Sequence, residues 1–307
     1  MSDTPFQFSA SAIHGVASEF LSCVALFNAP INLEGAVERL ELLWDMPVRA
    51  QWAEVEAEAS GGISGSLYHF ETPNAVTVML TPVSGELKED KGRLPDHRFH
   101  VMLTCFAPIS DPHTGEVLRR RDTTFFDPIT GLALDIDGGE MEENAEGEYV
   151  VDTNLAPELQ RRRRSVDAHT VMTQMMDMLM REEAAIGVYR PELGVVQPPN
   201  MVVELADLLS KGQAPVPLWV GVRTFKSELV NARTLGLPLF GHLDLDVMDS
   251  LHSEDDVYGL LSNLADYVIT SDQFLMPGHT ITYLGDKLTL TQTTSPADDA
   301  PVLRIAY

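Results

Sequence analysis

Alternating and continuous runs of apolar residues predict short β-strands along most of the chain. The alternation is clearest where Val76, Val78 and Leu80 are separated by Thr77 and Met79. Runs of this length, bounded by glycine, proline and asparagine, are typical of strands. The predicted strands are residues 19–27, 50–57, 65–70, 75–82, 98–106, 185–189, 194–197, 217–225, 236–249, 280–283, 287–291 and 303–306.

Other stretches carry apolar residues every three or four positions, which is the period of an amphipathic helix. The last of them has the clearest start, because Ser253 and Asp256 form a capping box ahead of Val257. Strand, helix and strand alternate in both halves of the chain. We therefore predict an α+β fold with mixed or antiparallel sheets, helices packed on one face, and two related ferredoxin-like units. The predicted helices are residues 33–43, 166–182, 200–209 and 253–269.

The region after residue 106 differs in composition from both flanking parts. No Lys or Arg occurs between Arg121 and Arg161, and turn signals such as Asp137-Gly-Gly interrupt the pattern. We interpret this region as an insertion made of a hairpin and an acidic loop. The predicted parts are an N-terminal α+β unit (1–106), an acidic insertion (107–160) and a C-terminal α+β domain (161–307).

Charge and composition narrow the possible partners. The 307 residues carry a formal net charge of −25, and such a field repels nucleic-acid phosphates and anionic membranes. No run approaches the roughly 18 apolar residues of a transmembrane helix, and the first residues lack the basic start of a secretory signal. We predict a cytoplasmic protein that binds neither nucleic acid nor membrane. Cys23 and Cys105 lie in apolar runs, which favours buried, unpaired thiols.

Two charged segments have competing interpretations. The acidic peak of the insertion either keeps a loop solvated or provides a contact surface for a basic protein. The run Arg161–Arg164 is interpreted as local neutralisation of that loop, because so short a run in so acidic a chain is weak evidence for phosphate binding. The candidate interaction residues are Glu140, Glu142, Glu143, Glu146 and Glu148.

His242, Asp244 and Asp246 form the sharpest candidate for chemistry. At positions i, i+2 and i+4 of a predicted strand, their side chains project to one face. An imidazole with two carboxylates can bind Mn²⁺, Fe²⁺ or Zn²⁺. Ordinary alternation favours a different interpretation, in which these residues form a solvated strand face and the intervening apolar residues form the buried face.

Five segments near the C-terminus carry a pattern that is also found elsewhere. They are Pro217-Leu-Trp-Val-Gly-Val-Arg, the stretch from Gly236 to Ser250, Leu260-Leu-Ser-Asn-Leu-Ala-Asp-Tyr-Val, Pro277-Gly-His-Thr-Ile and Leu303-Arg-Ile-Ala-Tyr. Together they resemble the bacterial family known as domain of unknown function 4261, over roughly residues 217–307 and more weakly over the rest. The resemblance implies a shared fold and supplies no catalytic or cofactor-binding residues.

No sequence motif designates an active site. Phosphate-binding glycine loops, a GxSxG nucleophile elbow and an HExxH zinc motif are all missing from the sequence. We therefore favour a non-enzymatic protein without a cofactor, which acts by protein–protein interaction through an acidic surface as a regulatory, stress-related or immunity-like adaptor. Its expected partner is a basic protein. The alternatives are a metal-dependent hydrolase that uses His242, Asp244 and Asp246, and an acidic mimic of nucleic acid that binds a basic protein.

Overall fold

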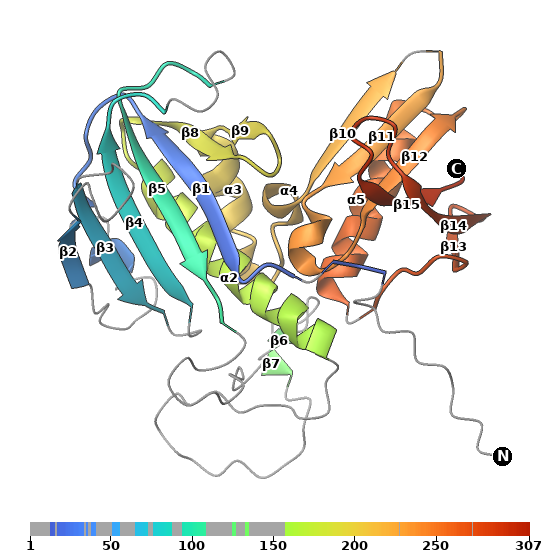
Figure 1. The fold of residues 1–307 in the computed structure, drawn as a ribbon, viewed down its shortest axis with the longest axis horizontal. Coiled ribbons are helices and arrows are strands. Elements are labelled where there is room, and N and C mark those ends of the chain that lie inside the picture. Colours follow the sequence, from blue (N-terminus) through green and yellow to red (C-terminus); the bar gives the residue numbers. More distant parts are fainter. Residues whose placement is uncertain are drawn as a thin grey trace, which may run out of the picture. The chain divides into compact units, whose positions relative to one another are not determined.

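Figure 1 shows the computed structural model of the chain, whose contacts divide it into two compact units. The N-terminal unit comprises Glu19–Leu155 and Val166–Leu218, and the C-terminal unit comprises Met1–Ser18, Ala156–Ser165 and Trp219–Tyr307. The residues that the structure describes are 13–15, 17–33, 35, 38–40, 51–55, 65–72, 76–87, 94–108, 125–126, 133–134, 157–226, 228–271 and 273–307.

The N-terminal unit is built on a seven-stranded sheet with the order β2-β3-β4-β5-β1-β8-β9. All neighbouring strands in it are antiparallel. Strands β1, β4, β5 and β8, with helical residues after β1 and helix α2 before β8, follow the β-α-β-β-α-β plan of a ferredoxin-like unit, and β2 and β3 extend it. The strands are Phe20–Phe27 (β1), Gln51–Val55 (β2), Gly65–Glu71 (β3), Thr77–Ser84 (β4), Phe99–Phe106 (β5), Ala185–Arg190 (β8) and Val195–Gln197 (β9).

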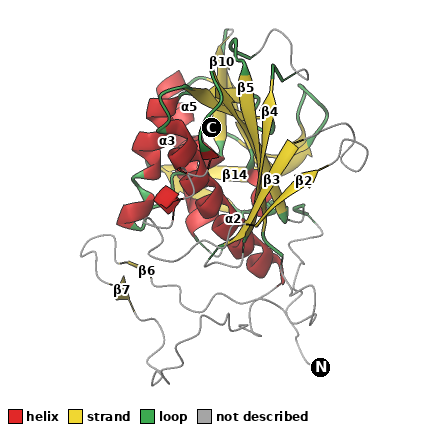
Figure 2. Cartoon of the chain, turned by 90° about the vertical axis from the view of Figure 1, so that its left-hand side faces the viewer, coloured by secondary structure: helices red, strands yellow, loops and turns green. Residues whose placement is uncertain are grey.

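Helices α2 (Pro157–Met180) and α3 (Pro199–Ala206) lie on the same side of this sheet (Figure 2). The predicted apolar face of α2 is confirmed as core, since Met172, Met175 and Met176 are fully buried. The two cysteines are also buried and free, and burial raises the pKa of Cys23 to about 12. Neutral thiols in the core are poor nucleophiles, which agrees with their predicted packing role.

The C-terminal unit contains a six-stranded mixed sheet with the order β10-β11-β12-β15-β14-β13. Its central strands β12 and β15 are parallel, and the other pairs are antiparallel. Helix α5 (Glu254–Thr270) packs on β10, β11 and β12, so its main contacts lie on one half of the sheet. The strands are Gly221–Lys226 (β10), Val230–Leu235 (β11), Asp244–Ser250 (β12), Thr280–Tyr283 (β13), Asp286–Thr294 (β14) and Pro301–Ile305 (β15).

The predicted α+β class is confirmed, and several details differ from expectation. Strands β8 and β9 hydrogen-bond to the sheet of the N-terminal unit, whereas the sequence analysis places them in a C-terminal domain. The second sheet does not repeat the order of the first, because two parallel strands are neighbours at its centre. The short helices α4 (Val216–Trp219) and η2 (Leu209–Lys211) accompany these elements.

Within the predicted insertion, β6 (Phe125–Phe126) and β7 (Ala133–Leu134) pair as a short antiparallel hairpin. The acidic residues Glu140, Glu142, Glu143, Glu146 and Glu148 lie outside the described residues. Their function as a contact surface stays a prediction. None of the described helices is both long and apolar enough to cross a membrane.

Candidate functional site

The segment that carries the predicted metal ligands is not one continuous strand. A 3₁₀ turn, η3 (Leu237–Phe240), precedes it, and Gly236 and Gly241 on either side have left-handed φ values of 112° and 69°. A side chain at Gly241 would also press on the backbone of Gly15 and Ala17 at 3.1 Å. Strand β12 therefore begins only at Asp244, and His242 lies before it.

The His242 ring is held by the backbone on both sides. Its Nδ1 donates to the carbonyl oxygen of Leu243 at 2.6 Å, and its Nε2 accepts from the amide of Leu275 at 3.2 Å. The ring also stacks on His14 with the centroids 4.2 Å apart. Burial lowers the pKa of His242 to about 3, and His14 adds to this effect. His242 is thus a neutral side chain whose two ring nitrogens are both in use.

The two aspartates have separate arginine partners (Asp246 accepts from Arg304 through both carboxylate oxygens, at 3.1 and 2.7 Å). Asp244 accepts from the Thr234 hydroxyl at 3.1 Å and lies 3.5 Å from the guanidinium of Arg233. Burial raises the pKa of Asp244 to about 6, and the Arg233 charge opposes that shift. Hydrogen bonds and ion pairs within the sheet therefore occupy both carboxylates.

The prediction that these residues form a solvated strand face is wrong, because His242, Asp244 and Asp246 are all buried. The register explains why: Asp246 lies directly between Arg233 on β11 and Arg304 on β15. Charged residues in neighbouring strands neutralise one another there. Within the described part of the chain, no group of three His, Cys, Asp or Glu is placed to hold a metal ion. Metal binding by these residues stays a prediction that requires the arginine contacts to be given up.

Arg162, from the predicted basic run, has a structural position in the C-terminal unit. It donates to the carbonyl oxygens of Phe240 at 3.1 Å, Val268 at 3.1 Å and Gln273 at 2.5 Å. Its guanidinium lies 3.8 Å from the centre of the Phe274 ring. A cation is well suited to the carbonyl end of a helix such as α5. Arg162 and Arg164 are buried, and neutralisation of the acidic insertion by this run stays a prediction.

Aromatic side chains gather where β12, β15 and β13 end and α5 begins, where His252 is exposed and Tyr283 and Tyr307 are half-buried. His252 and Tyr307 stack at 3.9 Å with almost parallel rings, and Tyr283 meets Tyr307 edge-on at 5.9 Å. We call these three residues the aromatic cluster. Burial raises the pKa of Tyr307, and the negative charges of Asp256 and Asp286 contribute to the shift. Both carboxylates therefore act on the cluster.

Two exposed leucines flank the aromatic cluster. Leu251, next to His252, is 89% exposed, and Leu284, next to Tyr283, is 76% exposed. Leu284 and Gly285 form the two-residue turn between β13 and β14, with φ values of 49° and 97°. Turns of this kind favour Asn or Gly, and a left-handed conformation costs an ordinary residue about 1–2 kcal/mol. An exposed leucine in this position adds nothing to the core and strains the turn.

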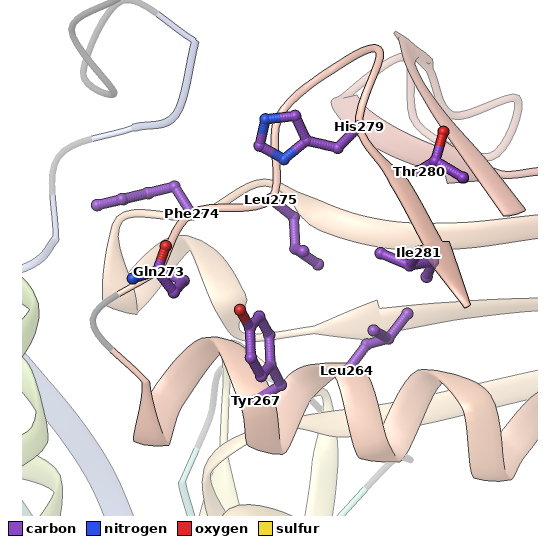
Figure 3. Close-up of a pocket in the computed structure, with 8 residues that line it drawn as sticks. All are labelled: Leu264, Tyr267, Gln273, Phe274, Leu275, His279, Thr280 and Ile281. Atoms are coloured by element: carbon purple, nitrogen blue, oxygen red, sulfur yellow. The ribbon is translucent and has the colours of Figure 1, made fainter. Parts of the chain in front are cut away.

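A pocket of about 440 Å³ opens at the other end of the same edge. Figure 3 shows Leu264 and Tyr267 rising from α5 toward Leu275 and Ile281, with His279 beyond them. The volume is within the roughly 300–1,000 Å³ range of ligand sites. The residues that line it are Leu264, Tyr267, Gln273, Phe274, Leu275, His279, Thr280 and Ile281.

The pocket and the aromatic cluster share the surface between α5 and β13, which we call the α5–β13 edge. Asp256, Asn263 and Tyr267 lie at helical spacing along one side of α5. The Tyr283 hydroxyl meets this side, since a side chain at Gly259 would lie 3.3 Å from it and the Asn263 amide lies 3.5 Å from it. The edge has an acidic end with the aromatic cluster and an apolar end with a pocket.

The periodicity of the sequence predicts the elements of this edge but indicates no site there. Strand β13 has its predicted bounds, and α5 has the predicted cap, in which the Ser253 hydroxyl accepts from the amide of Asp256 at 3.1 Å. A signal was present, because Leu284-Gly285 stands where a hairpin usually has Asn-Gly. The approach of Tyr307 and His252 had no local signal, as these residues are far apart in the chain.

Comparison with known proteins finds one family model that matches part of the C-terminal unit. Residues 233–306 match the model of a family described as domain of unknown function (DUF4261). The match confirms the resemblance of the C-terminal part and includes β12, α5, β13 and the pocket, while Tyr307 lies just beyond it. No curated protein and no solved structure matches the chain.

Proposed function

We propose that the C-terminal unit binds a partner protein and takes one of its arginine or lysine side chains at the aromatic cluster. The observation that carries this proposal is the stack of His252 and Tyr307 against Tyr283, within reach of two carboxylates. Aromatic faces attract cations with about 0.5–1 kcal/mol at exposed sites. Carboxylates beside the rings add electrostatic attraction for the same group.

The charge of the surroundings supports a basic partner. Residues 219–307 contain twelve Asp and Glu and five Lys and Arg. Two basic residues are close to the cluster in sequence: Arg304, which is bound by Asp246, and Lys287, which follows Asp286 in β14. Successive strand residues point to opposite faces, so Lys287 points away from the face that Tyr283 and Asp286 share.

The strained and exposed Leu284 supports the same conclusion. A solvated turn is more stable with Asn or Gly in this conformation, so the fold itself gains nothing from a leucine. A leucine at the rim of a contact surface contributes apolar area to a partner. Exposed leucines beside tyrosines and carboxylates fit an interface whose partner offers both basic and apolar groups.

The test uses the full chain and two fluorescein-labelled peptides. Both peptides are rich in Gly and Ser and contain one phenylalanine. They differ at one position, which is arginine in one peptide and glutamine in the other. Fluorescence anisotropy is measured at low and high salt. The arginine peptide is expected to bind at least about threefold more tightly, and Tyr283→Ala should remove this preference. Tyr258→Ala is the matched control, because Tyr258 is 47% exposed but lies on the opposite side of α5 from Asp256.

A second pair of variants separates a local site from the general attraction of a negative protein. Asp286→Asn and Glu204→Gln each remove one exposed carboxylate, the first beside the cluster and the second on α3 of the N-terminal unit. Only Asp286→Asn should reduce the arginine preference. Equal effects of the two variants, or no preference for arginine in the unmodified chain, would refute the proposal.

A further inference from the structure

We propose that the α5–β13 pocket receives a large apolar side chain of the same basic partner. The recognised motif would then be one arginine or lysine and one large apolar residue, two or three positions apart in an extended segment. This inference rests on the proposed function, because it assigns the second half of one contact surface.

The pocket has the composition of a side-chain anchor site. Leu264, Leu275 and Ile281 contribute aliphatic walls, and the polar groups of the lining are hydroxyl, amide and imidazole groups. Within the site, the His279 Nδ1 accepts from the amide of Met276 at 3.3 Å. Apolar walls with few polar groups favour an aromatic or aliphatic group over a charged one.

The spacing of the two half-sites follows from β13. Ile281 lines the pocket, and Tyr283, two residues further along the strand, belongs to the aromatic cluster. Residues two apart in a strand project to the same face and are about 7 Å apart. An extended partner segment beside this face has the same repeat, so side chains two positions apart reach both half-sites.

The position of β13 leaves room for such a segment. Among the described strands, β13 is the last in the sheet order, with β14 as its only neighbour. Helix α5 packs on the other half of the sheet, against β10, β11 and β12. The surface between α5 and β13 therefore opens at the edge of the sheet, where a partner chain can approach without displacing another strand.

Charge complementarity distinguishes the two ends of the surface. Asp256 and Asp286 act on the aromatic cluster, whereas the eight pocket-lining residues include no carboxylate and no Lys or Arg. A basic group is thus favoured at one end and an uncharged group at the other. The surface therefore favours a partner segment with one basic and one apolar side chain over a uniformly basic segment.

The test compares four labelled peptides on the full chain by fluorescence anisotropy. They contain Arg-Gly-Phe, Gln-Gly-Phe, Arg-Gly-Gly or the reversed Phe-Gly-Arg in the same Gly- and Ser-rich sequence. Replacement of the phenylalanine by glycine should weaken binding about tenfold or more, as burial of such a side chain implies. One of the two orders, Arg-Gly-Phe or Phe-Gly-Arg, should bind more tightly because the two ends of the surface differ.

Two substitutions assign this effect to the pocket. Leu264→Trp fills the pocket from α5 and should abolish the difference between the Phe and Gly peptides while the preference for arginine over glutamine persists. Tyr283→Ala should do the reverse, which completes a double-mutant cycle. Tyr267→Ala serves as a second pocket variant that removes wall area on the exposed side of α5, and circular dichroism confirms that each variant is folded.

The outcomes separate the two proposals. A preference for arginine without any effect of phenylalanine would overturn the apolar anchor and leave the proposed cation site standing. An effect of phenylalanine that Leu264→Trp and Tyr267→Ala both leave unchanged would also overturn the anchor. The absence of both preferences would refute the proposed function together with this inference.

Discussion

The buried strand β12 and the exposed α5–β13 edge use similar side chains in opposite ways. In β12 and the residues just before it, His242, Asp244 and Asp246 are surrounded by partners, and Asp246 accepts from two nitrogens of Arg304. At the edge, His252 and Asp286 remain exposed beside tyrosine rings. Residues of the same chemical type thus stabilise the fold in one place and face solvent in the other.

The difference teaches that reactive residue types are a poor guide to a site until their partners are known. A buried charge without a partner costs several kcal/mol, so a folded chain supplies one. His242 and the aspartates of β12 are the residue types that suggest a metal site in the sequence, but their partners in the fold occupy them. The side chains that remain available to a ligand are the tyrosines and leucines at the edge, which belong to no catalytic motif.

The largest predicted effect concerns the buried framework. Arg162→Met keeps the length of the side chain but removes its hydrogen bonds to three carbonyl oxygens. Hydrogen bonds to charged groups contribute about 1.5–3 kcal/mol each, so we expect a loss of about 3 kcal/mol or more in the free energy of unfolding. Urea denaturation measures it. Arg161→Met, at a partly exposed neighbouring position, should cost less than about 1 kcal/mol; a similar loss in both variants would contradict the structural function of Arg162.

The next effect concerns the ionisation of Asp244. Its pKa rises from 3.8 to about 6 on folding, so the folded state holds this proton more tightly. The corresponding stability is present below pH 3.8 and is lost as the pH rises through about 6, in total on the order of 3 kcal/mol. Asp244→Asn cannot ionise, and its stability relative to the unmodified chain should increase between pH 4 and pH 6.5. A constant difference over this range, measured by urea denaturation, would show that Asp244 ionises normally.

The same variant tests the predicted metal site. If His242, Asp244 and Asp246 bind Zn²⁺ or Mn²⁺, the added ion should raise the melting temperature of the unmodified chain, because ligands that bind the native state stabilise it. The increase should disappear in Asp244→Asn. If the ion pairs with Arg233 and Arg304 persist, neither ion should change the melting temperature, and the metal prediction would then be wrong.

The smallest effect sharpens the comparison at the exposed edge. Leu284→Asn relieves the left-handed strain and should stabilise the fold by about 1 kcal/mol, while binding of the arginine peptide weakens. Leu251→Asn is the matched control, since Leu251 is even more exposed but is not among the positive-φ residues. It should weaken binding without stabilising the fold. Tighter binding by Leu284→Asn would exclude Leu284 from the contact surface.

Local sequence was a sound guide to individual elements. The capping box at Ser253 predicted the start of α5, and apolar spacing predicted its buried residues, including Val257, Leu260 and Leu261. Strand β13 was also predicted with its observed bounds. These features depend on residues a few positions apart, which share one helix face or one strand.

The polar residues of β12 could not be interpreted in the same way. Asp246 is bound by Arg304, which is 58 positions away, and the amide of Leu243 donates to His14, 229 positions away. Alternation predicted a solvated face because nothing nearby in the sequence announces these partners. The site residues Tyr283 and Tyr307 also meet only through the pairing of β14 with β15.

The sequence by itself determined the α+β class, the strongly negative charge, the capped helix and the resemblance of the C-terminal part to a family of unknown function. Only the tertiary structure decided which charged groups neutralise one another and which face solvent. The physical reason is that helix and strand periodicity arise from local backbone geometry. Burial and ion pairing depend instead on strands that meet across long stretches of chain. The same long-range pairing that gives the charges of β12 their partners leaves His252, Leu251 and Leu284 exposed at the α5–β13 edge.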